Sequence, residues 1–193
     1  MTKKCFASFL FVLFFLPGLS YSKEFNAVGL TLGEPIKSVL EKFNNKGIKE
    51  LLKEKNQVVF ENPLIQLKGG GKTELDFFEN KLIGIKIYIS LENNRFQEFK
   101  KSYDRLKNIL IEKYGRPIKR KELIPPSYDG NISPTIIEEG IGYGVIFENT
   151  GVRIKLMLQT EKKRRFWYFL QYEDIEKSEQ KKKRVDNSLE ESL

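Results

Sequence analysis

Strict alternation of apolar and polar residues constrains the fold of this chain more than any other feature. From Ile83 to Ile89 every second residue is isoleucine, and the positions between them hold Gly84, Lys86 and Tyr88. A strand that places one face on a core and the other on water has this period of two. Because parallel strands are usually buried on both faces, the pattern predicts an antiparallel sheet that is covered on one side only.

The alternation returns in the second half of the chain. Residues 152–158 read VRIKLML and residues 166–172 read FWYFLQY, so both segments are predicted to be strands. In the second of them, Trp167 and Phe169 lie on the face opposite Tyr168 and Leu170. Further strand signals lie at 58–60, 64–67, 75–78 and 145–147.

Two segments have the apolar spacing of an amphipathic helix. In residues 28–43 the spacing begins at Ile36, with Thr31 or Gly33 as the expected cap and Pro35 in the first turn. In residues 96–114 an apolar stripe runs to a stop at Gly115. Residues 48–55 are interpreted as a further short helix. The apolar positions of the two main helices are Ile36, Val39, Leu40 and Phe43, then Phe96, Phe99, Tyr103, Leu106 and Leu110.

A helix followed by a strand meander occurs twice, over 28–90 and 96–173. The triplet Phe-Glu-Asn at 60–62, 78–80 and 147–149 stands where a hairpin turn is expected, which supports an internal duplication. Chance recurrence is the alternative, because asparagine favours turns wherever they occur. We predict one α+β domain over 23–173, with helices packed on an antiparallel sheet in two tandem helix-plus-meander repeats.

Two segments lie outside this pattern. Residues 122–141 lack periodicity and contain three prolines, as functional loops often do. From Glu173 onward the chain is strongly charged and has little apolar content. Residues 174–193 are therefore interpreted as a solvated C-terminal tail, partly helical and without a core of its own.

The first 22 residues have the organisation of a secretory signal peptide. Lys3 and Lys4 precede an apolar run from Phe6 to Leu16, and small residues at Ser20 and Ser22 fit a cleavage site. The run is too short to span a membrane. Cys5 stands at its start, not at the cleavage point, so the sequence has no lipid-anchoring motif. We expect a mature protein that begins at Lys23 and is periplasmic or secreted.

The composition excludes several chemistries. The chain has no histidine, and its only cysteine, Cys5, would leave with the signal peptide. Ser-His-Asp and Cys-His catalysis and the usual zinc sites are then impossible. Hydrolysis by paired carboxylates stays open. We expect no enzymatic activity, cofactor or metal. The full chain has a net charge of +8, and without Lys3 and Lys4 of the leader it is 32 − 26, or +6, which favours an anionic partner such as an acidic protein, a glycan or membrane headgroups.

Two short motifs resemble a known group of proteins. The start Gly29-Leu30-Thr31-Leu32-Gly33 with Val39 and Leu40, and the helix end Tyr114-Gly115-Arg116-Pro117, are similar to small exported bacterial α+β repeat proteins. That group includes the outer-membrane assembly lipoproteins and the β-lactamase-inhibitor-like proteins. The chain departs from the lipoproteins because it lacks their anchoring cysteine. The resemblance implies a protein-binding role in the cell envelope, without site residues to carry over.

Two sets of residues are candidate binding sites. Trp167 and Phe169 would form an exposed patch if helices cover only one face of the sheet, and would be core if a second layer covers the other. Lys162, Lys163, Arg164 and Arg165 crowd one hairpin turn, where a bound anion would relieve their repulsion.

Three functions are compatible with the composition and these sites. The leading hypothesis is an exported protein that binds another protein through the sheet face and the 122–141 loop. The alternatives are a surface adhesin that binds anionic polymers through the basic hairpin, and a carboxylate-dependent hydrolase. Nucleic acid is not an expected partner for an exported protein of this charge.

Overall fold

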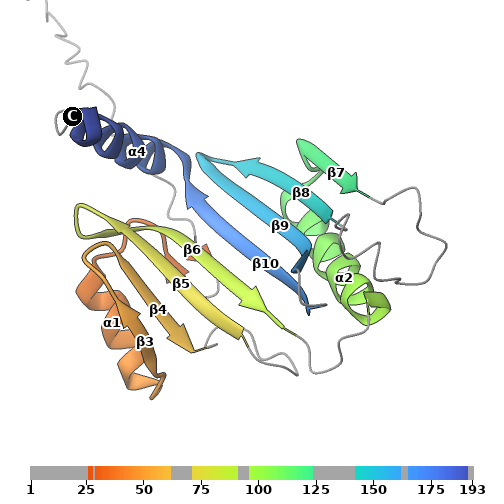
Figure 1. The fold of residues 1–193 in the computed structure, drawn as a ribbon, viewed down its shortest axis with the longest axis horizontal. Helices are drawn as coiled ribbons and strands as arrows, with labels where there is room; N and C mark the ends of the chain where they lie inside the picture. The colour runs from red at the N-terminus through yellow and green to blue at the C-terminus, as the bar shows by residue number, and fades with distance from the viewer. Residues whose placement is uncertain are drawn as a thin grey trace, which may run out of the picture.

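The computed structural model describes residues 26–27, 29–61, 71–90, 96–123, 142–161 and 165–190. Its main element is an eight-stranded antiparallel sheet in the order β3-β4-β5-β6-β10-β9-β8-β7 (Figure 1). The helices of this described part are α1 (Ile36–Asn45), α2 (Phe96–Tyr114) and α4 (Ile175–Glu190). A two-stranded ribbon, β1 (Asn26–Ala27) with β2 (Leu30–Thr31), precedes α1.

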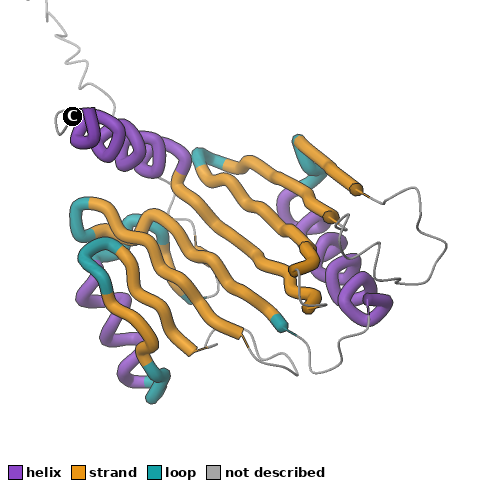
Figure 2. The backbone as a smooth tube through the Cα atoms, viewed as in Figure 1, coloured by secondary structure: helices purple, strands orange, loops and turns teal. Residues whose placement is uncertain are grey.

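The strands of the main sheet form two consecutive meanders (Figure 2). The first follows α1 and the second follows α2, and the two join where β6 pairs antiparallel with β10. This arrangement confirms the predicted α+β class and the helix-plus-meander order in both halves. The strands are β3 (Glu50–Lys53), β4 (Gln57–Glu61), β5 (Gly71–Phe78), β6 (Lys81–Ile89), β7 (Lys119–Leu123), β8 (Gly142–Asn149), β9 (Val152–Glu161) and β10 (Arg165–Asp174).

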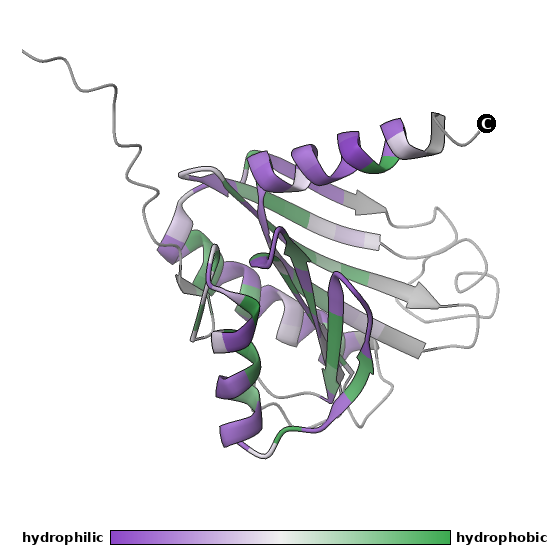
Figure 3. Ribbon diagram, turned by 90° about the vertical axis from the view of Figure 1, so that its left-hand side faces the viewer, coloured by the Kyte–Doolittle hydropathy of each residue, from purple (hydrophilic) through white to green (hydrophobic). Residues whose placement is uncertain are grey.

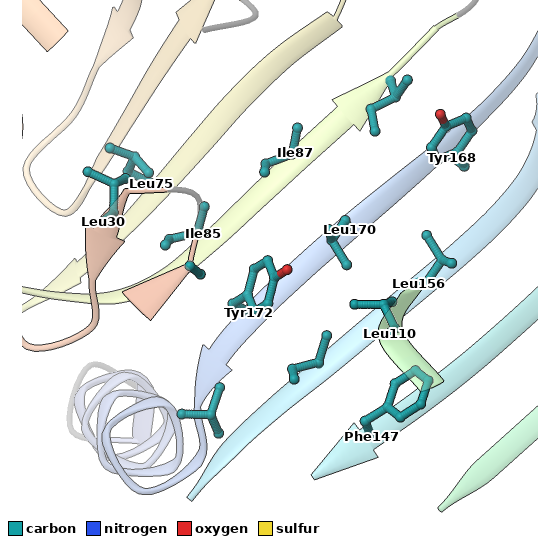
Figure 4. Packing of buried hydrophobic residues seen from close by; sticks show 14 of the residues in the cluster. Leu30, Leu75, Ile85, Ile87, Leu110, Phe147, Leu156, Tyr168, Leu170 and Tyr172 are labelled. Carbon is teal, nitrogen blue, oxygen red and sulfur yellow. The ribbon is translucent and has the colours of Figure 1, made fainter. Parts of the chain in front are cut away.

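Both α1 and α2 cover the same face of the sheet, which we call the helix face (Figure 3). The strand register aligns its apolar side chains in rows that cross the sheet. One row joins Ile87, Leu170, Leu156 and Val145, all of them fully or almost fully buried. A parallel row joins Ile85, Tyr172, Ile154 and Phe147 (Figure 4). The alternation in the sequence therefore corresponds to one continuous core.

The start of α1 is held by the β5–β6 hairpin, not by a side-chain cap. The Ile36 amide donates to the Asn80 carbonyl at 3.0 Å and the Gly33 amide donates to the Leu82 carbonyl at 2.7 Å. Pro35, expected in the first turn, is instead the residue before the first helical one. The Asn80 carbonyl satisfies the first amide of the helix, which would otherwise lack a partner. The expected cap at Thr31 or Gly33 is wrong, because Pro35 occupies the cap position.

Glu34 links this start to the rest of α1. Its carboxylate accepts hydrogen bonds from the Ser38 hydroxyl and the Lys42 ammonium, both at 2.6 Å. Burial raises the pKa of Glu34, but these two partners and the Thr31 amide outweigh burial and hold it below its ordinary value.

Helix α2 has the bounds that its apolar stripe predicts, and Gly115 follows it with a positive φ of 80°. Phe99 packs edge-on against Tyr168, with ring centroids 6.3 Å apart. The Ser102 and Tyr168 hydroxyls are 3.0 Å apart and share a hydrogen bond. Burial raises the pKa of Tyr168, so this phenol stays protonated beneath the helix.

The short helix expected over 48–55 is wrong. Residues 50–53 form β3, the edge strand that pairs with β4. Leu51 and Leu52 are about half exposed, at 50% and 47%. The apolar side chains of this segment are therefore not packed on the core, as those of an amphipathic helix would be. The ring of Phe60 in β4 stacks on the ring of Phe43 in α1, with centroids 4.1 Å apart. Strand β3 extends the sheet on the side of β4 away from β5.

The two described two-residue turns show that the Phe-Glu-Asn triplet does not mark one position. In the β5–β6 hairpin Glu79 and Asn80 are the turn residues and have positive φ. In the β8–β9 hairpin Glu148 and Asn149 still belong to the strand, and Thr150 and Gly151 make the turn. Both turns match the type I′ hairpin, whose twist suits antiparallel strands.

The charged C-terminal segment is helical over most of its length. Residues 175–190 form α4, which contacts β5, β6 and β10. The segment is therefore helical, as expected, and it contacts the sheet of the domain. The predicted leader (1–22), the strand at 64–67 and residues 124–141 of the predicted loop lie outside the described residues.

Candidate functional site: the open face of the sheet

The second face of the sheet lies opposite α1 and α2, and we call it the open face. Its side chains come from the alternate positions of the same strands, so their order follows from the register. The central members are Lys72, Glu74 and Asp76 of β5, Gly84, Lys86 and Tyr88 of β6, Trp167, Phe169, Gln171 and Glu173 of β10, and Arg153, Lys155 and Met157 of β9.

Three aromatic rings gather at the centre of this face, and we call them the aromatic cluster: Tyr88, Trp167 and Phe169. Trp167 stacks on Phe169 with centroids 5.7 Å apart, and Tyr88 lies 5.5 Å from Trp167 and 6.1 Å from Phe169. Phe169 is 8% exposed, whereas Tyr88 and Trp167 are partly exposed. The cluster is thus a packed aromatic surface with a buried base.

Two lysines lie on this cluster. The Lys86 ammonium is 4.4 Å from the Phe169 ring centroid and 4.7 Å from that of Tyr88, and the Lys72 ammonium is 4.5 Å from Tyr88. These are cation–π distances. Burial lowers the pKa of Lys86 below its ordinary value; Glu74 opposes the shift, while Lys72 and Lys155 add to it.

Glu74 connects the cluster to the charged part of the face. Its carboxylate accepts hydrogen bonds from the Lys72 ammonium at 2.7 Å and from the Tyr88 hydroxyl at 3.0 Å. Burial raises the pKa of Tyr88, and the neighbouring Glu74 charge raises it further. The phenol therefore remains a hydrogen-bond donor at physiological pH and holds the Tyr88 ring in place.

A glycine widens the apolar surface beyond the aromatic rings. Met157 of β9 pairs with Phe169 on one side and with Gly144 of β8 on the other. A Cβ atom at Gly144 would stand 2.5 Å from the Met157 sulfur. The absence of a side chain at Gly144 therefore gives Met157 its space, and a polarizable thioether of this kind adapts to different contact surfaces.

Helix α4 closes one end of the open face. Lys181 forms an ion pair with Asp76, Arg184 pairs with Glu79 at 2.7 Å, and Lys155 pairs with Glu173 at 2.9 Å nearby. A cavity of about 500 Å³ lies between α4, the β3–β4 turn and the sheet, with Gly84, Lys86, Gln171 and Lys181 in its wall. Within the described residues no group of histidine, cysteine, aspartate and glutamate is arranged to hold a metal ion.

The structure brings together one of the two predicted sites. Trp167 and Phe169 lie side by side on the open face, opposite Tyr168 and Leu170 as expected. Of the basic hairpin, Lys162, Lys163 and Arg164 lie outside the described residues, and Arg165 begins β10 without a described side chain.

Sequence reasoning missed Tyr88, Lys86 and Glu74, which complete the site. The signal was present, because Lys86 and Tyr88 are the residues between the buried isoleucines of β6. Only the pairing of β6 with β10 shows that they meet Phe169.

Comparison with known proteins adds no relative: no protein-family model matches the chain, and no curated protein or solved structure is significantly similar to it. Across the part of the chain that the structure describes, no helix has both the length and the apolar character that a membrane crossing requires.

Proposed function

We propose that this is an exported, non-enzymatic protein of the cell envelope or the extracellular space, and that it binds another protein through the open face. The observation that carries the proposal is the aromatic cluster at the centre of that face. Tyrosine, tryptophan, phenylalanine and methionine are the residues enriched where proteins recognise each other. Here Tyr88, Trp167, Phe169 and Met157 occupy neighbouring positions on one surface.

The layout of the face matches the anatomy of a binding surface. Its apolar centre is surrounded by charged side chains, with Glu74, Lys155 and Arg153 among them. Energetic hot spots of interfaces are central aromatic residues within a polar rim that excludes water. The cluster is also rigid before binding, because each ring packs on a neighbour, so little side-chain entropy is lost when a partner docks.

Export rests on the first 22 residues, with their basic start, apolar run and small-residue exit. The absence of histidine from the whole sequence supports a role without general acid–base catalysis. Binding of an anionic polymer through Lys162–Arg165 is the alternative function, and salt separates it from the main proposal. Polymer binding weakens steeply as ionic strength rises, whereas docking on an aromatic surface persists.

Site-specific photo-cross-linking in the native envelope tests the proposal. A photo-reactive amino acid at Arg153, on the rim of the open face, should form an adduct with one protein of defined mass. The same amino acid at Lys101, exposed on α2, is the matched control and should not form it. Trp167→Ala should reduce the Arg153 adduct at least severalfold. Equal adducts from both positions, or none from Arg153, would count against the open face.

A further inference from the structure

We propose that the partner places a carboxylate on the Lys86 ammonium and an apolar side chain on the aromatic cluster. The inference rests on the proposed function and names the chemistry of its partner, which is a protein segment that carries an aspartate or glutamate beside an apolar residue.

Lys86 stands apart from the other charges at the centre of the open face. Among the described residues, no carboxylate oxygen forms an ion pair with its ammonium. Three acids of the open face already hold other cations: Glu74 pairs with Lys72, Glu173 with Lys155, and Asp76 with Lys181. Lys86 contacts two aromatic rings instead.

A partner cannot cover the aromatic cluster without also covering Lys86. The ammonium lies 4.4 Å from the Phe169 ring centroid and 4.7 Å from that of Tyr88, so any side chain seated on these rings displaces water from it. An ammonium that loses its water without gaining an anion is strongly unfavourable. An incoming carboxylate removes this penalty.

The surroundings of Lys86 favour an anion over a second cation. The Glu74 charge attracts the Lys86 ammonium, whereas Lys72 and Lys155 repel it. Because Glu74, Glu173 and Asp76 each pair with another lysine, Lys86 is the cation of this group that has no carboxylate of its own. Gln171 faces Lys86 directly in the strand register and shares the wall of the cavity under α4. Its side-chain amide can donate to the second oxygen of a carboxylate that binds Lys86. Ammonium and amide together make a receptor for one carboxylate.

Peptides of constrained loop shape test this inference directly, because their selection requires only the protein itself. A library of disulfide-cyclised random peptides is selected for binding to the full chain. Peptides that bind the open face are those that compete with one another and no longer bind the Trp167→Ala variant. These peptides should be enriched in aspartate or glutamate next to an apolar residue. The Lys86→Met variant keeps the aliphatic stem and removes the charge; Lys101→Met on α2 is the matched control.

A double-mutant cycle then measures the pairing. Lys86→Met should weaken the binding of a selected acidic peptide at least tenfold. Replacing the peptide's aspartate or glutamate by the corresponding amide should weaken its binding to the wild type equally. Combining both changes should cause no further loss, and Lys101→Met should change nothing. Circular dichroism and thermal unfolding establish that each variant is folded.

The remaining outcomes overturn one proposal or both. In one outcome the selected peptides depend on Trp167 and yet show no enrichment in acids and bind Lys86→Met normally. That result would overturn the proposed carboxylate on Lys86 and leave the proposal of protein binding intact. If no peptide depends on Trp167, both proposals fail. Heparin serves as a competitor: if it binds through Lys86 and its binding is unchanged in Trp167→Ala, the face recognises a polyanion and the proposed protein partner is overturned.

Discussion

The two faces of the central sheet are made from the same strands and have opposite characters. On the helix face, rows of apolar side chains cross from β6 to β8 under α1 and α2, and most of their members are fully buried. On the open face, the residues between them are rings, lysines and acids that pair with one another. Stability is concentrated on the first face, which leaves the second free to carry recognition.

The comparison also explains why the open face is ordered without a covering layer. Its rings stack on each other and its acids hold neighbouring lysines, so the side chains are fixed by contacts within the face. A surface fixed in this way is organised for binding at the expense of some stability, because burial disfavours the charged form of Lys86. Four predictions test this division of roles.

Substitutions at two neighbouring residues of β9 should give the largest difference in stability between the two faces. Leu156 is fully buried on the helix face, and Leu156→Ala should lower the free energy of unfolding by about 3 kcal/mol through the cavity it leaves. Met157, the next residue, lies on the open face, and Met157→Ala should cost less than about 1 kcal/mol. Urea denaturation of both variants measures the contrast. Similar losses would mean that the open face is also a core.

A single buried hydroxyl offers a way to improve the helix face. Thr73 lies in the apolar row between Phe60 and Ile87, and its hydroxyl has no hydrogen-bond partner among the described residues. Thr73→Val has the same shape and should raise the free energy of unfolding by about 1 kcal/mol. Thr73→Ser, which keeps the hydroxyl and removes a methyl group, is the control and should destabilise. A loss of stability in Thr73→Val would show that the hydroxyl is satisfied.

Removing the charge of Lys86 should stabilise the protein slightly and weaken its binding of acidic peptides. Burial lowers the pKa of this lysine in the folded state, so folding disfavours its charged form. The wild type should therefore gain stability as pH rises through the folded pKa toward the ordinary value of 10.5, and Lys86→Met should lack this gain. Denaturation at neutral pH and near the ordinary pKa compares the two chains. If the wild type loses more stability than Lys86→Met as the pH rises, the expected direction of the pH dependence is wrong.

The smallest effect is expected where α4 meets the open face. Lys181→Ala removes the ion pair with Asp76 and should cost about 0.5 kcal/mol, since partly exposed pairs contribute little. Lys183→Ala, an exposed neighbour on the same helix, should be neutral. High salt should abolish the difference between these variants. A loss of several kcal/mol for Lys181→Ala would show that α4 is integral to the core.

Local patterns predicted most of the fold. The stripe from Phe96 to Leu110 gave α2 its bounds, and the alternation in 83–89 and 152–158 identified strands and their buried faces. The prediction failed at 48–55, where a short apolar segment is compatible with helix or strand, and an edge position beside β4 decided for strand. It missed the attachment of α4, because ion pairs to Asp76 and Glu79 leave no apolar signal in the sequence.

The sequence by itself determined which side chains of each strand face a core and which face away, because the period of two is a property of the backbone. It also determined that histidine and thiol chemistry are unavailable to the mature chain as predicted. Only the tertiary structure decided that Tyr88, Lys86 and Glu74 meet Trp167 and Phe169. That meeting depends on the register in which β6 joins β10, and such long-range pairing is fixed by the packing of the whole core, not by any local pattern.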